Sequence, residues 1–269
     1  MSEERGSCCI APRIGSFGKT DCRCPKIMTD SWRMIDYSSK DPAMNLAIDE
    51  AILRSVLEQR SPNTLRLWRN PSTVVIGHFQ EPESVTSFAD CRTLKVRIVR
   101  RGSGGGAVYH DYGNLNYSVI VHKSLLNANV ENVEESYNFF CAGIIEGLKD
   151  LGVQAFNCGG NIMVEGKKIS GSAQHRLYDG ILHHGTLMVN VDLQTLGRTL
   201  RIPDPDNTLM NLSEILRDRI PVNRIKKAVK IGYEKAFDAT FRLEKLSLYE
   251  ERMARRLHQL KYNTKDWNG

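Results

Sequence analysis

The chain has no apolar run near the roughly 20 residues that a membrane-spanning helix requires. Its first residues also form no apolar stretch of the secretory kind, and Glu3 and Glu4 are atypical of a transit peptide. These absences argue against a membrane partner and against secretion. They predict a cytoplasmic protein.

Cysteine pairs of the zinc-binding kind are also missing. The seven cysteines contain no C-x-x-C spacing, so no metal site is predicted from them. Cys91, Cys141 and Cys158 stand alone, as reduced cytosolic thiols do. Residues 1–30 show no sustained hydrophobic period, so we expect a disordered leader there and a single domain over residues 31–269. The role of four leader cysteines stays open: Cys8, Cys9, Cys22 and Cys24.

The positive charge is modest and lies mostly late in the chain. The 37 Lys and Arg residues exceed the 31 Asp and Glu residues by six. Solvated helix faces explain this surplus, and a docking face for an acidic protein is the alternative. Nucleic acid is the least favoured partner, because no aromatic stacking residues accompany the basic ones.

Hydrophobic periodicity predicts an α+β fold with a mixed, largely antiparallel sheet flanked by helices. One helix is expected to begin with Asp41 as its cap and Pro42 in its first turn. Others are expected to end at Gly152 and to cover about 221–238 and 247–260. Alternating or apolar segments predict strands within residues 64–70, 72–79, 95–101, 115–121, 153–156, 161–176 and 181–191, with a turn at Asp179-Gly180.

The segment RRGSGGGAVYHDYG, residues 100–113, places two arginines before four glycines. Glycine clusters occur where the backbone turns tightly or approaches a ligand, and arginine beside them indicates an anion. A Walker A loop does not fit, because Gly160 and Gly166-Lys167 are separated by five residues instead of four. A dinucleotide fingerprint fits the letters of residues 102–107, but the period-two pattern that follows predicts a strand where that motif needs a helix.

The remaining interpretation is a glycine-rich loop between strands whose amides form an anion-binding concavity. A phosphate-bearing ligand would need a second cation beside Arg101. Lys167 and Lys168 are the candidates, and strand alternation allows only one of them to face the ligand.

The motifs RRGSGGGAVYHDYGNLNYS, NIMVEGKKISGSAQ and HHGTLMVN resemble the lipoate–protein ligase family. The similarity covers roughly residues 34–203, with weaker echoes in KYNTKDWNG at 261–269. The resemblance implies the biotin/lipoate ligase fold, which is related to class II aminoacyl-tRNA synthetases, and makes residues 31–269 the catalytic domain. It implies activation of lipoate or octanoate with ATP and Mg²⁺, then transfer of the acyl group to a lysine of a lipoyl-domain acceptor protein.

The same resemblance implies roles for individual residues. Lys168 would contact both the acyl carbonyl and the α-phosphate. The nucleotide would be held by Arg101, Gly104, Gly105, Gly106, Ala107, Val108, Tyr109 and Asn116. Weaker candidates for the substrate pocket are Gly77, Gln80, His110, Asp111 and His184, and turn capping explains Asp111 nearly as well. No residue is assigned as a metal ligand.

Two departures from the family pattern bear on the ATP step. Asn161 follows Gly160 where family members carry Asn-Asp before Ile, so a carboxylate is lost. The chain also ends soon after its catalytic region, as in the archaeal-type short form whose accessory domain is a separate polypeptide. We therefore expect weak adenylation by this chain alone and a possible gain from an accessory subunit.

Two other functions stay open. One is a related acyltransferase that takes octanoyl from an acyl carrier protein through a cysteine thioester, without ATP. Cys158 lies ten residues before Lys168 and is the candidate nucleophile. The other, from a different class, is a non-catalytic adenylate-binding or regulatory module. A biotin ligase fits less well, because the KKISGSAQ motif favours lipoate.

Overall fold

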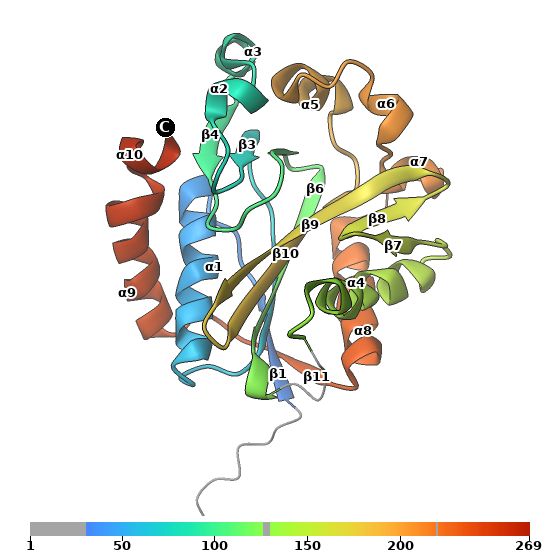
Figure 1. Ribbon diagram of the computed structural model, residues 1–269. Coiled ribbons are helices and arrows are strands. Elements are labelled where there is room, and N and C mark those ends of the chain that lie inside the picture. Colours follow the sequence, from blue (N-terminus) through green and yellow to red (C-terminus); the bar gives the residue numbers. More distant parts are fainter. Residues whose placement is uncertain (1–30, 126–129, 219) are drawn as a thin grey trace, which may run out of the picture.

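The computed structural model describes residues 31–125, 130–218 and 220–269, so the predicted leader and its four cysteines lie outside the described residues. The main sheet has eight strands in the order β11-β1-β2-β6-β10-β9-β8-β7 (Figure 1). β1 runs parallel to both of its neighbours, and the other pairs are antiparallel. The strands are β1 (Ser31–Asp36), β2 (Thr64–Trp68), β6 (Asn114–His122), β7 (Phe156–Cys158), β8 (Asn161–Val164), β9 (Lys167–Leu177), β10 (Gly180–Met188) and β11 (Thr240–Leu243).

A smaller sheet carries the glycine-rich segment. Its three strands have the order β4-β3-β5, with β4 at Arg97–Arg100, β3 at Thr73–Ile76 and β5 at Val108–His110. The four glycines therefore connect β4 to β5. A strand follows them, as predicted, and no dinucleotide-type helix begins there.

Helices cover both faces of the main sheet. α1 (Pro42–Leu57) and α9 (Leu248–Leu257) pack together on one face, and α4 (Val133–Lys149) and α8 (Val222–Phe237) pack together on the other (Figure 1). Each pair buries its own cluster of apolar side chains against the strands. The short helices are α2 (Pro82–Val85), α3 (Phe88–Thr93), α5 (Leu193–Leu200), α6 (Pro205–Thr208), α7 (Leu212–Ile215) and α10 (Lys265–Asn268), with a 3-10 turn at Lys123–Leu125 and a π-helical turn at His258–Tyr262.

The α+β class with a mixed, largely antiparallel sheet is confirmed. α1 begins as predicted, because the Asp41 carboxylate accepts a hydrogen bond from the Ala43 amide at 3.0 Å and Pro42 occupies the first turn. The extended segment 161–176 contains two strands, β8 and β9. Glu165 and Gly166 both adopt positive φ and form a tight turn between β8 and β9, which an apolar pattern does not reveal.

No helix in the described part of the chain is long and apolar enough to cross a bilayer.

A buried ion pair ties α9 to the sheet and yields a stability prediction. Glu250 accepts hydrogen bonds from Arg33 at 2.6 and 3.1 Å, and the two side chains are 0% and 3% exposed. We expect Glu250→Ala to lower the free energy of unfolding by about 3–5 kcal/mol, because it leaves a guanidinium buried without its partner. Urea unfolding measures this. Glu251→Ala, one residue later at an exposed position, should change it by less than about 1 kcal/mol.

The same pair makes stability sensitive to acid. Burial raises the pKa of Glu250, but hydrogen bonds and charge from Arg33 outweigh burial and hold it below the usual 4.5. The stabilisation is therefore present above the unfolded pKa and is lost as pH falls through the folded one.

Candidate active site

A cavity of about 150 Å³ lies between the glycine-rich segment and the main sheet. The glycine-rich segment forms one wall, and β9 and β10 form the other. Apolar atoms of Leu46, Trp68 and Val75 also line the cavity. Its remaining lining residues are Arg101, Gly105, Gly106, Ala107, Val108, His110, Asn161, Lys168, Gly171, Ser172, Ala173, His184, Gly185 and Thr186. Residues from segments far apart in the sequence thus meet around one mixed polar and apolar space.

Arg101 lines this cavity, but its guanidinium is largely directed at the chain itself. Its Nη2 donates to the carbonyls of Gly104 at 2.6 Å and Gly106 at 2.8 Å, and its Nε donates to Ser103 Oγ at 2.9 Å. Burial lowers the pKa of Arg101 to about 10, which leaves it charged at neutral pH. The arginine therefore shapes the glycine-rich segment and supplies positive potential to the cavity.

Lys168 extends along β9 into the cavity. Its Nζ lies 2.6 Å from the position that a Cβ on Gly171 would occupy, so a larger residue at 171 would displace the amine. Burial, and then the charge of Arg101, lower the pKa of Lys168. Lys167 points the other way and donates to the Asp206 carbonyl at 2.7 Å. The alternation expected for this lysine pair is present.

His184 is a buried polar group between the cavity and the glycine-rich segment. Its Nε2 lies 2.6 Å from Ser103 Oγ, and its Nδ1 lies 4.0 Å from the Asp49 carboxylate. Burial, followed by the charge of Arg101, holds the pKa of His184 well below 6.5, so the ring is neutral. The carboxylate favours the proton on Nδ1, which makes Nε2 the acceptor of the Ser103 hydroxyl. This contact anchors the segment to β10.

The other predicted residues fall into two groups. His110 lines the cavity, with a pKa lowered to about 3 by burial. The side chain of Asp111 instead accepts hydrogen bonds from the amides of Gly113 and Asp192, the turn-capping role weighed for it. The Tyr109 ring is buried in an apolar cluster away from the cavity lining. Gly104 also lies outside the lining.

Asn116 is buried, and neither polar atom of its side-chain amide has a partner among the described residues. It lies on β6 between Trp68 of β2 and Thr186 of β10, directly opposite each in register. Both neighbours line the cavity, so Asn116 lies next to the cavity lining.

Gly77 and Gln80 do not line the cavity. Gly77 instead packs against the glycine-rich segment, and Gln80 binds Gly77. The Gln80 side chain accepts a hydrogen bond from the Gly77 amide at 2.8 Å. A Cβ on Gly77 would lie 2.1 Å from the Gly105 carbonyl oxygen, so only glycine allows this approach.

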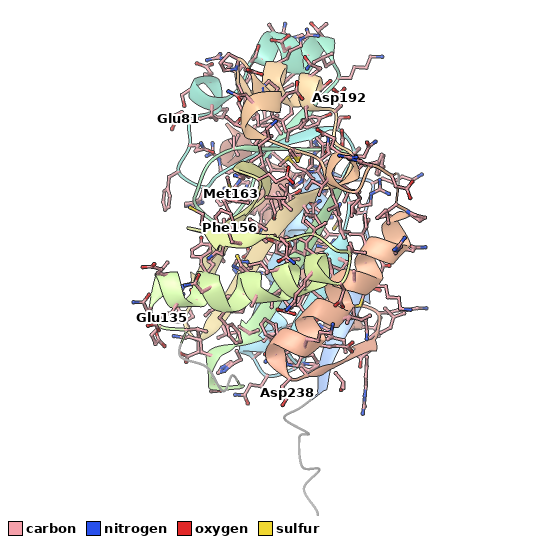
Figure 2. All side chains as sticks on the ribbon, turned by 90° about the vertical axis from the view of Figure 1, so that its right-hand side faces the viewer. Glu81, Glu135, Phe156, Met163, Asp192 and Asp238 are labelled. Atoms are coloured by element: carbon pink, nitrogen blue, oxygen red, sulfur yellow. The ribbon has the colours of Figure 1, made fainter. Side chains whose placement is uncertain are left out.

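Cys158 lies at the edge of the sheet on the same face as Lys168. Cys158 pairs with Asn161, and Met163, two residues further along β8, pairs with Lys168. A β-bulge interrupts the register between Ile162 and Met163. Lys168 nevertheless lies on the Asn161 side, because its Nζ is 2.6 Å from the Cβ position of Gly171, the partner of Asn161. Directly paired residues share a face, so Cys158 projects on that side too. Figure 2 shows Met163 beside Phe156, its partner on β7. Cys158 is exposed and lies outside the cavity lining, to which its partner Asn161 and Lys168 both belong.

The turn that follows Cys158 is held in place by two hydrogen bonds of Gly160. Gly159 and Gly160 both have positive φ. The Gly160 amide donates to the Asn157 side chain at 2.9 Å, and its carbonyl accepts from Ser172 Oγ at 2.7 Å. Ser172 is itself a lining residue, so the cysteine turn and the cavity wall are one connected unit.

Sequence reasoning missed several of these residues. Ser103 sits inside the glycine run, and its hydrogen bond to His184 depends on a contact 81 residues away. Asp49 appears in the sequence as an ordinary helix residue, yet it is paired with Arg66 in the interior at 2.6 Å. The one available signal was the presence of charged residues within otherwise apolar segments, which indicates buried pairs.

The described residues contain no group of three or more His, Cys, Asp or Glu side chains arranged to hold a metal ion. Arg101, Lys168, two histidines of lowered pKa and the glycine-rich backbone instead surround a cavity with an apolar side. Such a site can bind an acyl chain and stabilise negative charge on its carbonyl oxygen. A cavity that combines an apolar side with converging charged and polar groups is typical of an enzyme active site.

The lipoyl protein ligase A/B catalytic domain matches residues 41–234, and the chain belongs to that family. Octanoyltransferase LipM of Carboxydothermus hydrogenoformans is 31% identical over 88% of this chain and 98% of the relative. The Bacillus subtilis octanoyltransferase LipM is 28% identical over 89% and 98%.

Solved structures show the same fold. A lipoate-protein ligase A bound with ATP is 27% identical, with a TM-score of 0.81 over 88% of this chain and 98% of that one. The bipartite lipoate protein ligase of Thermoplasma acidophilum, studied with its E2 lipoyl domain, is 26% identical, with a TM-score of 0.79 over 89% and 96%.

Proposed function

We propose that this protein is an octanoyltransferase that moves an octanoyl group from a carrier-protein thioester, through Cys158, to a lysine of a lipoyl domain. The observation that carries the proposal is the position of Cys158 on the face of the sheet that presents Lys168. This chain covers nearly the whole length of the relatives named octanoyltransferase, which supports the same activity here. We therefore favour acyl transfer through Cys158 over ATP-dependent activation of the free acid.

In the first step the Cys158 thiolate attacks the carbonyl carbon of the octanoyl thioester. A carbon–sulfur bond forms to Cys158, the bond to the carrier thiol breaks, and the carrier leaves as its thiol after taking a proton. Lys168 stabilises the thiolate and the oxyanion that forms on the carbonyl oxygen. Its lowered pKa eases proton transfer from the amine to the leaving sulfur.

In the second step the ε-amine of the acceptor lysine attacks the Cys158 thioester. An amide bond forms, the bond to Cys158 breaks, and the amine loses one proton. Lys168 accepts that proton, which restores the starting state. The thioester brings its own activation, so the overall transfer needs no nucleotide.

The ATP-dependent ligase is the second candidate, and the ATP-bound ligase A structure with the same fold favours it. The residues of this cavity fit Mg-ATP poorly. Three donor contacts of Arg101 go to backbone carbonyls and to Ser103, and the neutral Asn161 stands where the ligase pattern carries an aspartate.

Parallel assays with apo lipoyl domain as acceptor test the proposal. One contains octanoyl carrier protein and no ATP, and the other contains ATP, Mg²⁺ and octanoate or lipoate. Modification of the acceptor in the first assay supports the transferase. Modification only in the second, with pyrophosphate release, overturns it in favour of the ligase, and a gain from an added accessory subunit would identify the short-form ligase. Ligand binding without transfer in either assay would indicate a non-catalytic module.

A further inference from the structure

Arg100, the residue before the cavity arginine, is bound to a turn that lies far away in the sequence. Its backbone amide donates to the Asn268 side-chain oxygen at 2.8 Å. Its carbonyl accepts from the Trp267 indole at 2.8 Å, and its Nε donates to the Trp267 carbonyl at 2.6 Å. Trp267 and Asn268 therefore hold the backbone and the side chain of Arg100. Their helix, α10, lies beside β4 (Figure 1).

The other end of the Arg100 guanidinium donates hydrogen bonds to three backbone carbonyls of the loop after β3. Nη1 donates to Gly77 at 3.2 Å, to His78 at 3.0 Å and to Gln80 at 2.6 Å. Three carbonyls that converge on one nitrogen define the path of this loop. An arginine can do this because its donors are fixed in one plane.

That loop lies directly against the glycine-rich wall of the cavity. The His78 amide donates to the Ser103 carbonyl at 2.8 Å, and the Gly77 backbone approaches the Gly105 carbonyl too closely for any side chain. Gly105 lines the cavity. A displacement of the loop at 77–80 is therefore transmitted to the wall.

The α10 turn is itself anchored to α1. Lys261 Nζ lies 4.3 Å from the Trp267 ring centroid and donates to Glu50 at 2.7 Å. Tyr262 donates to the same carboxylate at 2.6 Å, and the Asn268 amide donates to the Tyr262 carbonyl at 3.0 Å. Trp267 and Asn268 thus connect α1, through Lys261 and Tyr262, to Arg100 and the loop at 77–80.

We propose that Trp267 and Asn268 are positioning residues for the acyl-group cavity. They hold Arg100, which holds the 77–80 loop, which in turn supports the glycine-rich wall at Gly105. The inference rests on the proposed function only for its effect on turnover. Its structural part concerns the two loops and needs no substrate.

Trp267→Phe and Asn268→Ala test the proposal in the full chain. Trp267→Phe keeps an aromatic ring beside Lys261 and removes the indole donor to Arg100. Asp266→Ala changes an exposed neighbour in the same turn and is the matched control. We expect amide hydrogen exchange at residues 77–80 and 102–106 to become at least about tenfold faster in both variants and unchanged in Asp266→Ala.

Turnover provides the second measurement. A wall displaced by a fraction of an ångström should lower kcat/KM by about 10- to 100-fold, while the thermal midpoint stays close to that of the native chain. Unchanged exchange in both loops would overturn the inference, as would native kcat/KM together with faster exchange. If the native chain transfers no octanoyl group, the proposed function fails, but the exchange experiment still decides the positioning role.

Discussion

Cys158→Ser is expected to lower octanoyl transfer from carrier protein to lipoyl domain by on the order of 10⁴-fold. A serine hydroxyl of ordinary pKa cannot replace a thiolate as the nucleophile, because Lys168 is too weak a base to ionise it. Because Cys158 is exposed at a sheet edge, the substitution removes little packing and should leave the thermal midpoint nearly unchanged. Initial rates under saturating carrier substrate measure the loss.

A second cysteine serves as the control. Cys91 is buried in an apolar cluster, and burial raises the pKa of its thiol. Cys91→Ala should retain the rate within about threefold while it lowers stability by about 1 kcal/mol. Native transfer by Cys158→Ser would show that the acyl group does not pass through this residue.

Lys168→Ala is expected to lower the same transfer rate by about 10²- to 10⁴-fold, the range for loss of a group that moves a proton and stabilises developing charge. Lys168→Arg should recover little, because a guanidinium remains protonated and its planar head is too large for the space over Gly171. Single-turnover kinetics with preformed acyl-enzyme separate the effects on the two steps.

The adjacent lysine is the matched control for Lys168. Lys167 has the same side chain, but it faces away and bonds to the Asp206 carbonyl. Lys167→Ala should keep transfer within about twofold. Equal losses in the two variants would mean that charge on β9, and not an amine inside the cavity, supports the reaction.

The sequence was most informative where the signal is local. Asp41 and Pro42 predicted the start of α1, and the period-two pattern after the glycines predicted β5 and β6. The two long motifs placed Lys168 and the glycine-rich segment in one site, and both line the cavity. The helix start and the strands depend on residues within a few positions of one another, whereas the shared site of Lys168 and the glycine-rich segment was implied by the family resemblance alone.

Contacts between distant segments could not be predicted in this way. Phosphate binding by Arg101 stays a prediction, but the fold reveals acceptors for its donors that the sequence does not, among them the Val75 carbonyl on β3. Ser103 acquires its role from His184 on β10. The importance of Cys158 depends on the register of β7, β8 and β9, since a shift by one residue would turn its side chain to the other face.

The central claim is that the acyl group is carried by Cys158, and trapping that intermediate tests it most directly. The full chain is mixed with octanoyl carrier protein, without ATP or acceptor, quenched in acid and digested, and the peptides are weighed. We expect one octanoyl group on the peptide that contains Cys158, removable by neutral hydroxylamine and absent in Cys158→Ser. An unmodified Cys158 peptide in a preparation that transfers octanoate when acceptor is added would contradict it.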